Sequence, residues 1–195
     1  MRVSRMIRRV AALAAASGIA VASLALTAVS ADAATTYQGK VTANGGLTIR
    51  SAPSTHTSNN GTVAKGKTVT IACKVPGSSV DGNRLWYKLS NGKGWLAARY
   101  VDNVGKAPKY CPSDDTEYGD GRTTATVNTR KGPHFNDAKT GTLAKGKRVT
   151  VVCYVKSTAG VDGNFTWYQL DNKSWVTAAY VKRLNTPATN WVPCA

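Results

Sequence analysis

One arginine and three aromatic residues occur in the same order in each half of the chain. These eight side chains are the best candidates for binding a ligand. Aromatic faces stack on sugar rings and peptide planes, and Trp and Tyr add a polar hydrogen-bonding group. A guanidinium can hold a carboxylate through two parallel hydrogen bonds. The candidate ligand-binding residues are Arg50, Trp86, Trp95 and Tyr100 in the first half of the chain, and Arg130, Trp167, Trp175 and Tyr180 in the second.

The same side chains also have structural explanations, and for the aromatic residues both interpretations stay open. A small β-barrel needs large side chains to fill its interior. An arginine that closes a strand before a long loop can bind the carbonyl groups of that loop, and we favour this role for Arg50 and Arg130. Asp81-Gly82 and Asp162-Gly163 are typical turn sequences, so we expect them to set turn geometry.

Strand alternation separates the neighbouring aromatic residues by face. In the segment 85–89, Tyr87 and Leu89 share one face and Trp86 lies on the other. Leu89 is a natural core residue, so we expect Trp86 to be the more exposed aromatic side chain. The same reasoning predicts an exposed Trp167 and a buried Tyr168 in the second half of the chain.

Reactive groups for catalysis are scarce. A glycosidase needs two carboxyl groups roughly 5–10 Å apart across a cleft, whereas Glu117 is the only glutamate and has acidic neighbours. A metallohydrolase needs several His or Asp ligands, and we expect the two histidines, His56 and His134, in exposed loops. The sequence therefore predicts a protein that is not an enzyme and that uses neither a metal nor another cofactor.

The chain contains one stretch twice, and this duplication organises the rest. Residues 61–73 and 141–153 match at an offset of 80, and other landmarks follow in the same order, including a Trp-Tyr pair and a Val-Asp-Gly-Asn tetrapeptide. So many ordered matches indicate a duplicated domain. The 195 residues of the chain leave room for two domains of about 80 residues each.

Each repeat carries two cysteines that can stabilise a small core. Domains of this size bury limited apolar surface. Four cysteines allow three pairings, and the duplication favours Cys73–Cys111 and Cys153–Cys194, because each copy should close on itself. Disulfides persist outside the cytosol, so this pattern indicates an exported protein.

Residues 1–33 have the organisation of a signal peptide. Four arginines precede an uncharged, Ala-rich run from Val10 to Val29, and Ala31-Asp32-Ala33 is a typical cleavage site. We expect cleavage after Ala33 and export from the cell, with an uncleaved membrane anchor as the alternative.

The remaining chain is strongly basic. From residue 34 on it carries 22 basic and 9 acidic residues, a net charge of +13, and four of the acids lie within 112–121. Such a surface attracts polyanions through long-range, salt-sensitive forces. Solubility is the alternative explanation of the charge.

Short β-rich segments alternate with Gly-containing turns in both repeats, which predicts an all-β fold with a small antiparallel barrel in each. The hairpin turn 171–174 lacks both glycines of its counterpart 91–94, so we expect a different turn type there. In the first repeat the pattern predicts strands at 47–50, 69–71, 85–89 and 95–97, loops at 51–60 and 76–83, and one helical turn at 98–101. We expect the tail 185–195 to wrap back so that Cys194 reaches Cys153.

Several ordered blocks carry a family resemblance. In the first repeat they are Leu47-Thr48-Ile49-Arg50-Ser51-Ala52-Pro53, Gly61-Thr62-Val63-Ala64-Lys65-Gly66, Trp86-Tyr87-Lys88-Leu89, Gly92-Lys93-Gly94-Trp95-Leu96 and Tyr100-Val101, and counterparts of these blocks recur in the second. This pattern resembles the bacterial SH3 family (SH3b). The resemblance implies two tandem SH3-like β-barrels, at residues 34–111 and 122–195, joined by an acidic, flexible linker at 112–121.

The resemblance also implies a binding function, because SH3b domains are best known for binding peptidoglycan. We expect a secreted, non-catalytic protein, extracellular or cell-wall associated, that binds peptidoglycan or an anionic wall polymer. A secreted protein is the alternative partner, with this chain as an inhibitor or partner of an exported enzyme, and a small hydrolase is the third hypothesis. We expect no specific nucleic-acid ligand and no stable membrane insertion after cleavage.

Overall fold

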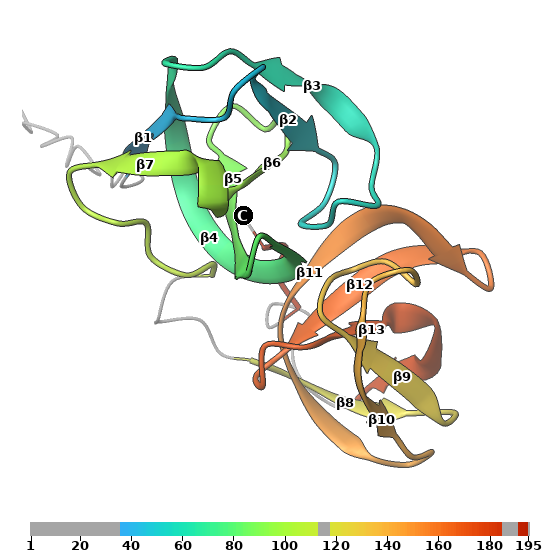
Figure 1. Cartoon of the computed structure of the whole chain (residues 1–195). Coiled ribbons are helices and arrows are strands. Elements are labelled where there is room, and N and C mark those ends of the chain that lie inside the picture. The colour runs from blue at the N-terminus through green and yellow to red at the C-terminus, as the bar shows by residue number, and fades with distance from the viewer. Residues whose placement is uncertain (1–35, 113–117, 185–190, 195) are drawn as a thin grey trace, which may run out of the picture. The chain divides into compact units, whose positions relative to one another are not determined.

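The computed structural model describes residues 36–112, 118–184 and 191–194, which form two curled antiparallel sheets (Figure 1). The first sheet has the strand order β3-β2-β6-β5-β4-β1-β7. Its elements are β1 (Tyr37–Val41), β2 (Leu47–Arg50), β3 (Asn59–Val63), β4 (Thr68–Val80), β5 (Asn83–Leu89), β6 (Trp95–Ala97), the 3₁₀ helix η1 (Ala98–Tyr100) and β7 (Val101–Val104).

The second sheet has the order β10-β9-β13-β12-β11-β8-β14, which repeats the first strand for strand. Its elements are β8 (Gly119–Thr123), β9 (Val127–Arg130), β10 (Lys139–Leu143), β11 (Arg148–Val161), β12 (Asn164–Leu170), β13 (Trp175–Thr177), the 3₁₀ helix η2 (Ala178–Tyr180) and β14 (Val181–Arg183). The all-β fold with two curled antiparallel sheets is therefore confirmed. The described residues include no helix long and apolar enough to cross a membrane.

Each sheet is curled around one long strand, which is β4 in the first sheet and β11 in the second. The first part of β4 pairs with β1, and from Ile71 to Val80 the strand pairs with β5 (Figure 1). The prediction of a loop at 76–83 was wrong, because β4 continues to Val80 and meets β5 through the two-residue turn Asp81-Gly82. Both turn residues have positive φ, 46° and 80°, as a tight hairpin turn requires.

A glycine lets this extension of β4 pack closely. A Cβ at Gly77 would lie 2.1 Å from the carbonyl oxygen of Pro53 and 2.6 Å from Cδ1 of Trp86. No side chain fits there, so β4 can lie directly against the loop after β2 and over the Trp86 ring. Pro and Gly in the sequence 76–80 suggested a loop, whereas they mark a bulged strand.

Three hydrophobic clusters hold the described residues together. Each sheet has its own core, which contains Tyr87 and Leu89 in the first and Tyr168 and Leu170 in the second. The third cluster contains residues of both sheets: Ala52, Cys73, Val75, Trp86, Trp95, Ala97 and Cys111 with Cys153, Val155, Ala159, Trp167, Trp175 and Cys194. The outward face of each sheet thus contributes to one shared core.

Both predicted disulfides are confirmed, Cys73–Cys111 and Cys153–Cys194. The segment that carries the second cysteine of each pair lies parallel to the long strand, where Tyr110 pairs with Lys74 and Pro193 pairs with Tyr154. The wrapping back of Cys194 onto Cys153 is confirmed as well.

Smaller predictions had mixed outcomes. The helical turn at 98–101 is η1. The connection 171–174 is one residue shorter than its counterpart between β5 and β6. The first bend is nevertheless the same in both, because Gly92 (φ 75°) and Lys173 (φ 64°) each donate a backbone N–H to the carbonyl three residues before, so the two hairpins differ in length only. Strand β8 begins at Gly119, inside the segment 112–121 that was predicted to be a linker. The rest of that linker prediction falls mostly on 113–117, outside the described residues, as does the predicted signal peptide.

Candidate functional site: two equivalent pockets

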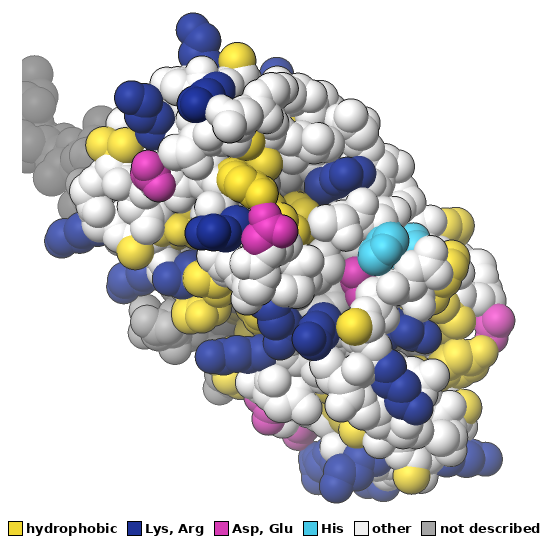
Figure 2. Space-filling model, viewed as in Figure 1, with side chains coloured by type: hydrophobic (Ala, Val, Ile, Leu, Met, Phe, Trp, Pro, Cys, Tyr) yellow, Lys and Arg dark blue, Asp and Glu magenta, His cyan; other side chains and the backbone are white. Residues whose placement is uncertain are grey.

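A pocket of about 440 Å³ lies at the end of the first sheet where β2, β5 and η1 meet. Its lining residues are Ala43, Asn44, Gly46, Leu47, Thr48, Arg50, Thr55, Val80, Trp86, Ala97 and Tyr100. Three of the predicted binding residues, Arg50, Trp86 and Tyr100, therefore come together there. Basic side chains are spread over the face shown in Figure 2, and acidic ones are few.

The second sheet has a pocket of about 200 Å³ made from the same positions. It is lined by Thr126, Val127, Asn128, Arg130, Phe135, Val161, Trp167, Thr177 and Tyr180. Each of these nine residues corresponds, at an offset of 80 or 81, to a residue that lines the first pocket. The duplication thus includes the pockets as well as the strands that form them.

Residue 135 explains much of the difference in volume between the two pockets. Thr55 lines the first pocket, and Phe135, 80 positions later, lines the second. The phenyl ring is much larger than the threonine side chain and is 48% exposed at the pocket rim. The first pocket is consequently the roomier of the two.

A tryptophan lies deep in each pocket. Trp86 and Trp167 are only 1% and 2% exposed, and each donates its indole N–H to a backbone oxygen 2.8 Å away, that of Ser78 and Ala159 respectively. The prediction that these two side chains are exposed was wrong. Alternation placed them correctly on the face opposite Tyr87 and Tyr168, but the end of the long strand and the shared core cover that face.

The arginines hold the loops beside the pockets. Arg50 donates from a terminal guanidinium nitrogen to the carbonyl oxygen of Thr57 (2.9 Å), and Arg130 does the same to that of Asp137 (3.0 Å). This is the structural role predicted for both. Among the described residues, no carboxylate lies within 4.0 Å of either guanidinium, so both charges remain available to an anionic group.

A tyrosine–aspartate pair closes the rim of each pocket. Tyr100 donates its hydroxyl to a carboxylate oxygen of Asp81, and Tyr180 does so to Asp162 (2.6 Å). The hydrogen bond and the negative charge of the aspartate raise the pKa of both tyrosines. The aspartates sit in the turns as predicted, and their second role was missed. The aspartates correspond at an offset of 81 and the tyrosines at an offset of 80, so the repeat pairs both groups.

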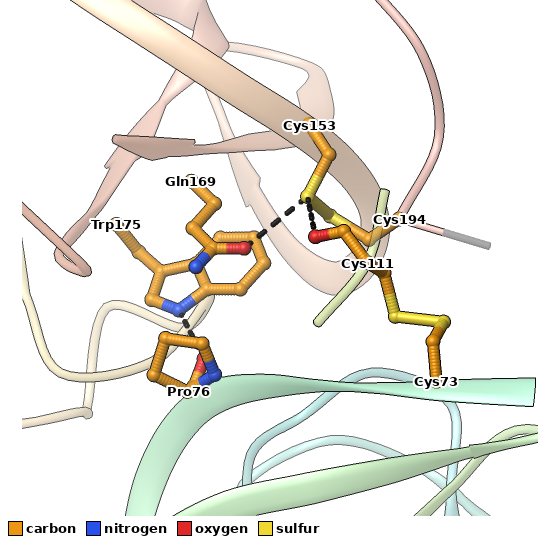
Figure 3. The surroundings of a disulfide bond; sticks show 7 residues. All are labelled: Cys73, Pro76, Cys111, Cys153, Gln169, Trp175 and Cys194. Carbon is orange, nitrogen blue, oxygen red and sulfur yellow. Dashed lines mark hydrogen bonds between the residues drawn. A yellow bond between two sulfur atoms is a disulfide. The ribbon is translucent and has the colours of Figure 1, made fainter. Parts of the chain in front are cut away.

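The other two predicted residues, Trp95 and Trp175, do not line these pockets. Trp175 is fully buried in the shared core, where its indole N–H donates to the carbonyl oxygen of Pro76, 2.8 Å away in β4 (Figure 3). In the same region, the carbonyl oxygen of Cys111 lies 3.9 Å from Sγ of Cys153 (Figure 3). Trp95 lies beside Lys88, whose ammonium nitrogen is 5.0 Å from the ring centre.

A polar cluster joins the loops that follow β2 and β9. Asp137 is buried and accepts hydrogen bonds from Ser54 (2.9 Å) and from the His56 ring nitrogen Nδ1 (3.1 Å). His56 stacks on His134, with ring centres 5.4 Å apart, and the histidines are side by side in Figure 2. The prediction that both histidines are exposed was wrong for His134, which is 7% exposed because the opposite loop covers it.

This cluster contains Ser, His and Asp, but its connections are not those of a catalytic triad. In a triad the serine donates to the histidine, which the aspartate orients. Ser54 is fully buried and donates to Asp137 instead. Burial raises the pKa of Asp137 and lowers that of His134. The described residues hold no group of three or more His, Cys, Asp or Glu side chains suited to a metal ion.

The region of the chain that contains the first pocket matches a known protein family. Residues 45–102 match the family described as bacterial SH3 domain. Residues 45–102 of this chain are a bacterial SH3 domain. The match spans Arg50, Trp86 and Tyr100, so the first pocket is a feature of the SH3 domain itself, apart from Ala43 and Asn44 at its edge.

Two solved structures are similar to the chain. The endolysin LysPBC5 CBD has a TM-score of 0.28 and 12% identity, over 77% of this chain and 95% of that one. NlpC2 from Trichomonas vaginalis has a TM-score of 0.27 and 11% identity, over 77% of this chain and 49% of that one. A comparison with curated proteins found no match.

Proposed function

We propose that the chain is a secreted, non-catalytic protein that binds peptidoglycan or an associated wall polymer through two SH3b pockets. One pocket belongs to each repeat, at residues 34–111 and 122–195. The observation that carries this proposal is the equivalence of the two pockets, in which nine positions correspond and Arg, Trp and Tyr are identical. A protein that keeps the same three polar and aromatic groups at both cavities has a use for both.

The chemistry of the pockets suits wall polymers. Peptidoglycan offers sugar rings, peptide planes and carboxylates, which aromatic rings and guanidinium groups recognise. Tyr100 and Tyr180 present partly exposed rings for this purpose, above the buried tryptophans. The uncompensated charge of Arg50 and Arg130 attracts an anionic group, and the net charge of the chain adds long-range attraction. The pockets supply recognition groups and no nucleophile paired with a base, which favours binding over hydrolysis.

The two pockets differ in size, and this difference predicts unequal binding. Phe135 occupies space in the second pocket that Thr55 leaves open in the first. The first pocket therefore provides most of the affinity, and the second adds avidity where the ligand repeats at a matching distance.

Retention of residues 34–195 on purified peptidoglycan sacculi tests the proposal. The informative variant is Thr55→Phe, because Phe is the residue that the second repeat already carries at this position. It should fill the first pocket and weaken retention about tenfold, a loss of about 1.4 kcal/mol. Phe135→Thr should strengthen retention, since it opens the second pocket.

Ser58→Phe is the matched control, because Ser58 is exposed in the same loop and does not line the pocket. It should leave retention unchanged. No retention of the unchanged protein at low salt would contradict the proposal. Equal weakening of retention by Thr55→Phe and Ser58→Phe would mean that binding does not use the pocket. Complete loss in high salt with no effect of Thr55→Phe would assign binding to charge alone.

A further inference from the structure

A third cavity, of about 200 Å³, lies where the two sheets share their core. Ser51, Lys88 and Trp95 line it from the first sheet, and Tyr154, Lys156 and Cys194 are among the residues that line it from the second. None of its lining residues is acidic. It is separate from the two equivalent pockets, since it shares no residue with either.

Two lysines give this cavity an uncompensated positive charge. Lys88 is half-buried beside the Trp95 ring, and burial lowers its pKa. Lys156 donates to the hydroxyl of Thr166 (2.7 Å). Among the described residues, no carboxylate lies within 4.0 Å of either ammonium group. A half-buried ammonium without a counter-charge is unfavourable, and an anion in the cavity would relieve this.

Two further hydrogen-bonding groups of the cavity residues are unused. Ser51 Oγ is buried and has no hydrogen-bond partner among the described residues. Trp95 is 1% exposed, and within the same residues its indole N–H has no acceptor. By contrast, Trp86, Trp167 and Trp175 each donate to a backbone oxygen. Buried polar groups are normally satisfied, so the Ser51 hydroxyl points to a missing acceptor. The Trp95 nitrogen is not among the fully buried atoms, so its N–H remains accessible to the same acceptor.

We propose that this cavity binds a single oxyanion, a carboxylate or phosphate group, held by Lys88 and Lys156 together with the indole N–H of Trp95 and the hydroxyl of Ser51. All four groups can donate to oxygen. Both sheets contribute, so the site exists only while they are packed together, and a bound anion stabilises that packing.

The site has no second copy. The residue that corresponds to Lys88 in the second repeat is Gln169, a buried neutral side chain whose Oε1 lies 3.2 Å from Sγ of Cys153 (Figure 3). The two sheets therefore form one anion site between them, whereas each has its own aromatic pocket.

Nuclear magnetic resonance of the tryptophan indole N–H groups tests the proposal on residues 34–195 with both disulfides intact. Sodium phosphate and sodium acetate are titrated separately, up to about 50 mM, with chloride holding the ionic strength constant. We expect the Trp95 indole signal to shift saturably in at least one titration, with an affinity in the millimolar range or tighter. The anion that binds more tightly identifies the oxyanion class.

The variants separate a built site from general charge. Lys88→Gln introduces the residue that the second repeat carries at this position, and it should weaken anion binding at least tenfold. Ser51→Ala should weaken it severalfold, and it removes no internal hydrogen bond made by the side chain. Lys93→Gln is the control, because this exposed hairpin lysine carries the same charge away from the cavity. A Trp95 signal that does not saturate with either anion, or equal weakening by Lys88→Gln and Lys93→Gln, would overturn the proposal.

Discussion

The hydrogen bond from Trp175 to Pro76 gives a direct measure of how far the two sheets act as one folded unit. Trp175 lies in β13 and is fully buried, and its acceptor lies in β4 of the other sheet. Trp175→Phe keeps an aromatic ring but leaves the carbonyl of Pro76 without a donor. A buried acceptor left without a partner costs about 1–3 kcal/mol. We therefore expect Trp175→Phe to lower the free energy of unfolding by that amount, and Trp175→Ala by about 3–5 kcal/mol.

Urea unfolding of residues 34–195 with intact disulfides measures the loss, followed by circular dichroism and fluorescence. Hydrogen exchange with mass spectrometry then locates it. Because the bond joins the sheets, peptides from β4 should exchange faster in Trp175→Phe, as should peptides from β13. Phe165→Ala serves as the control, since Phe165 is 49% exposed and its removal should change stability by no more than about 0.5 kcal/mol.

Two results would refute this reasoning. If exchange rises only in the second sheet, the sheets do not depend on each other through this contact. If Trp175→Phe is no more destabilising than Phe165→Ala, the indole N–H contributes nothing to the shared core. Separate unfolding transitions for the two sheets in the unchanged protein would likewise count against a shared core.

Three further predictions concern a buried acid, a rim tyrosine and a tightly packed glycine. Burial raises the pKa of Asp137 above its unfolded value, so its contribution to stability is complete below the unfolded pKa and is lost as pH rises through the folded pKa. Urea unfolding from pH 4 to 7 should show the unchanged protein losing stability relative to Asp137→Asn as pH rises, and the opposite trend would contradict this. Asp162→Asn should lower the pKa of Tyr180 in an ultraviolet titration of tyrosine ionisation, because the carboxylate raises it; an unchanged titration would exclude the pair. Gly77→Ala should lower the free energy of unfolding by about 1–3 kcal/mol through overpacking, and more than Gly141→Ala, whose Cβ would approach a neighbouring atom no closer than 3.3 Å.

The sequence was sufficient to predict most of the fold. The offset of 80 implied two copies of one unit, and the structure has two sheets with the same strand order. The duplication also selected the disulfides, because each copy closes on itself. The loop predicted at 76–83 was the main failure. Pro76 and Gly77 suggest a break, and only the close approach of Pro53 and Trp86 shows why a strand needs glycine there.

The site was predictable in part. Six of the eight candidate residues line two equivalent pockets, because strand ends and the following helical turn meet at the same edge of each sheet. The partner of each rim tyrosine could not be identified, since the hydrogen bond depends on how the turn folds over the pocket. The cluster around Asp137 was also missed. It brings together loops about 80 residues apart, and neither loop alone indicates the other.

The tryptophans show where reasoning about one repeat reaches its limit. Alternation assigned Trp86 and Trp167 to the face opposite each sheet's own core, and that assignment is correct. These tryptophans are nevertheless buried, because the face of each sheet that points away from its own core packs against the other sheet. The duplication contained this signal: both copies carry tryptophans at Trp86 and Trp95 and their counterparts, on a face that a solitary domain would leave in water. Two large apolar faces in one chain can cover each other, and burial of that surface favours their doing so.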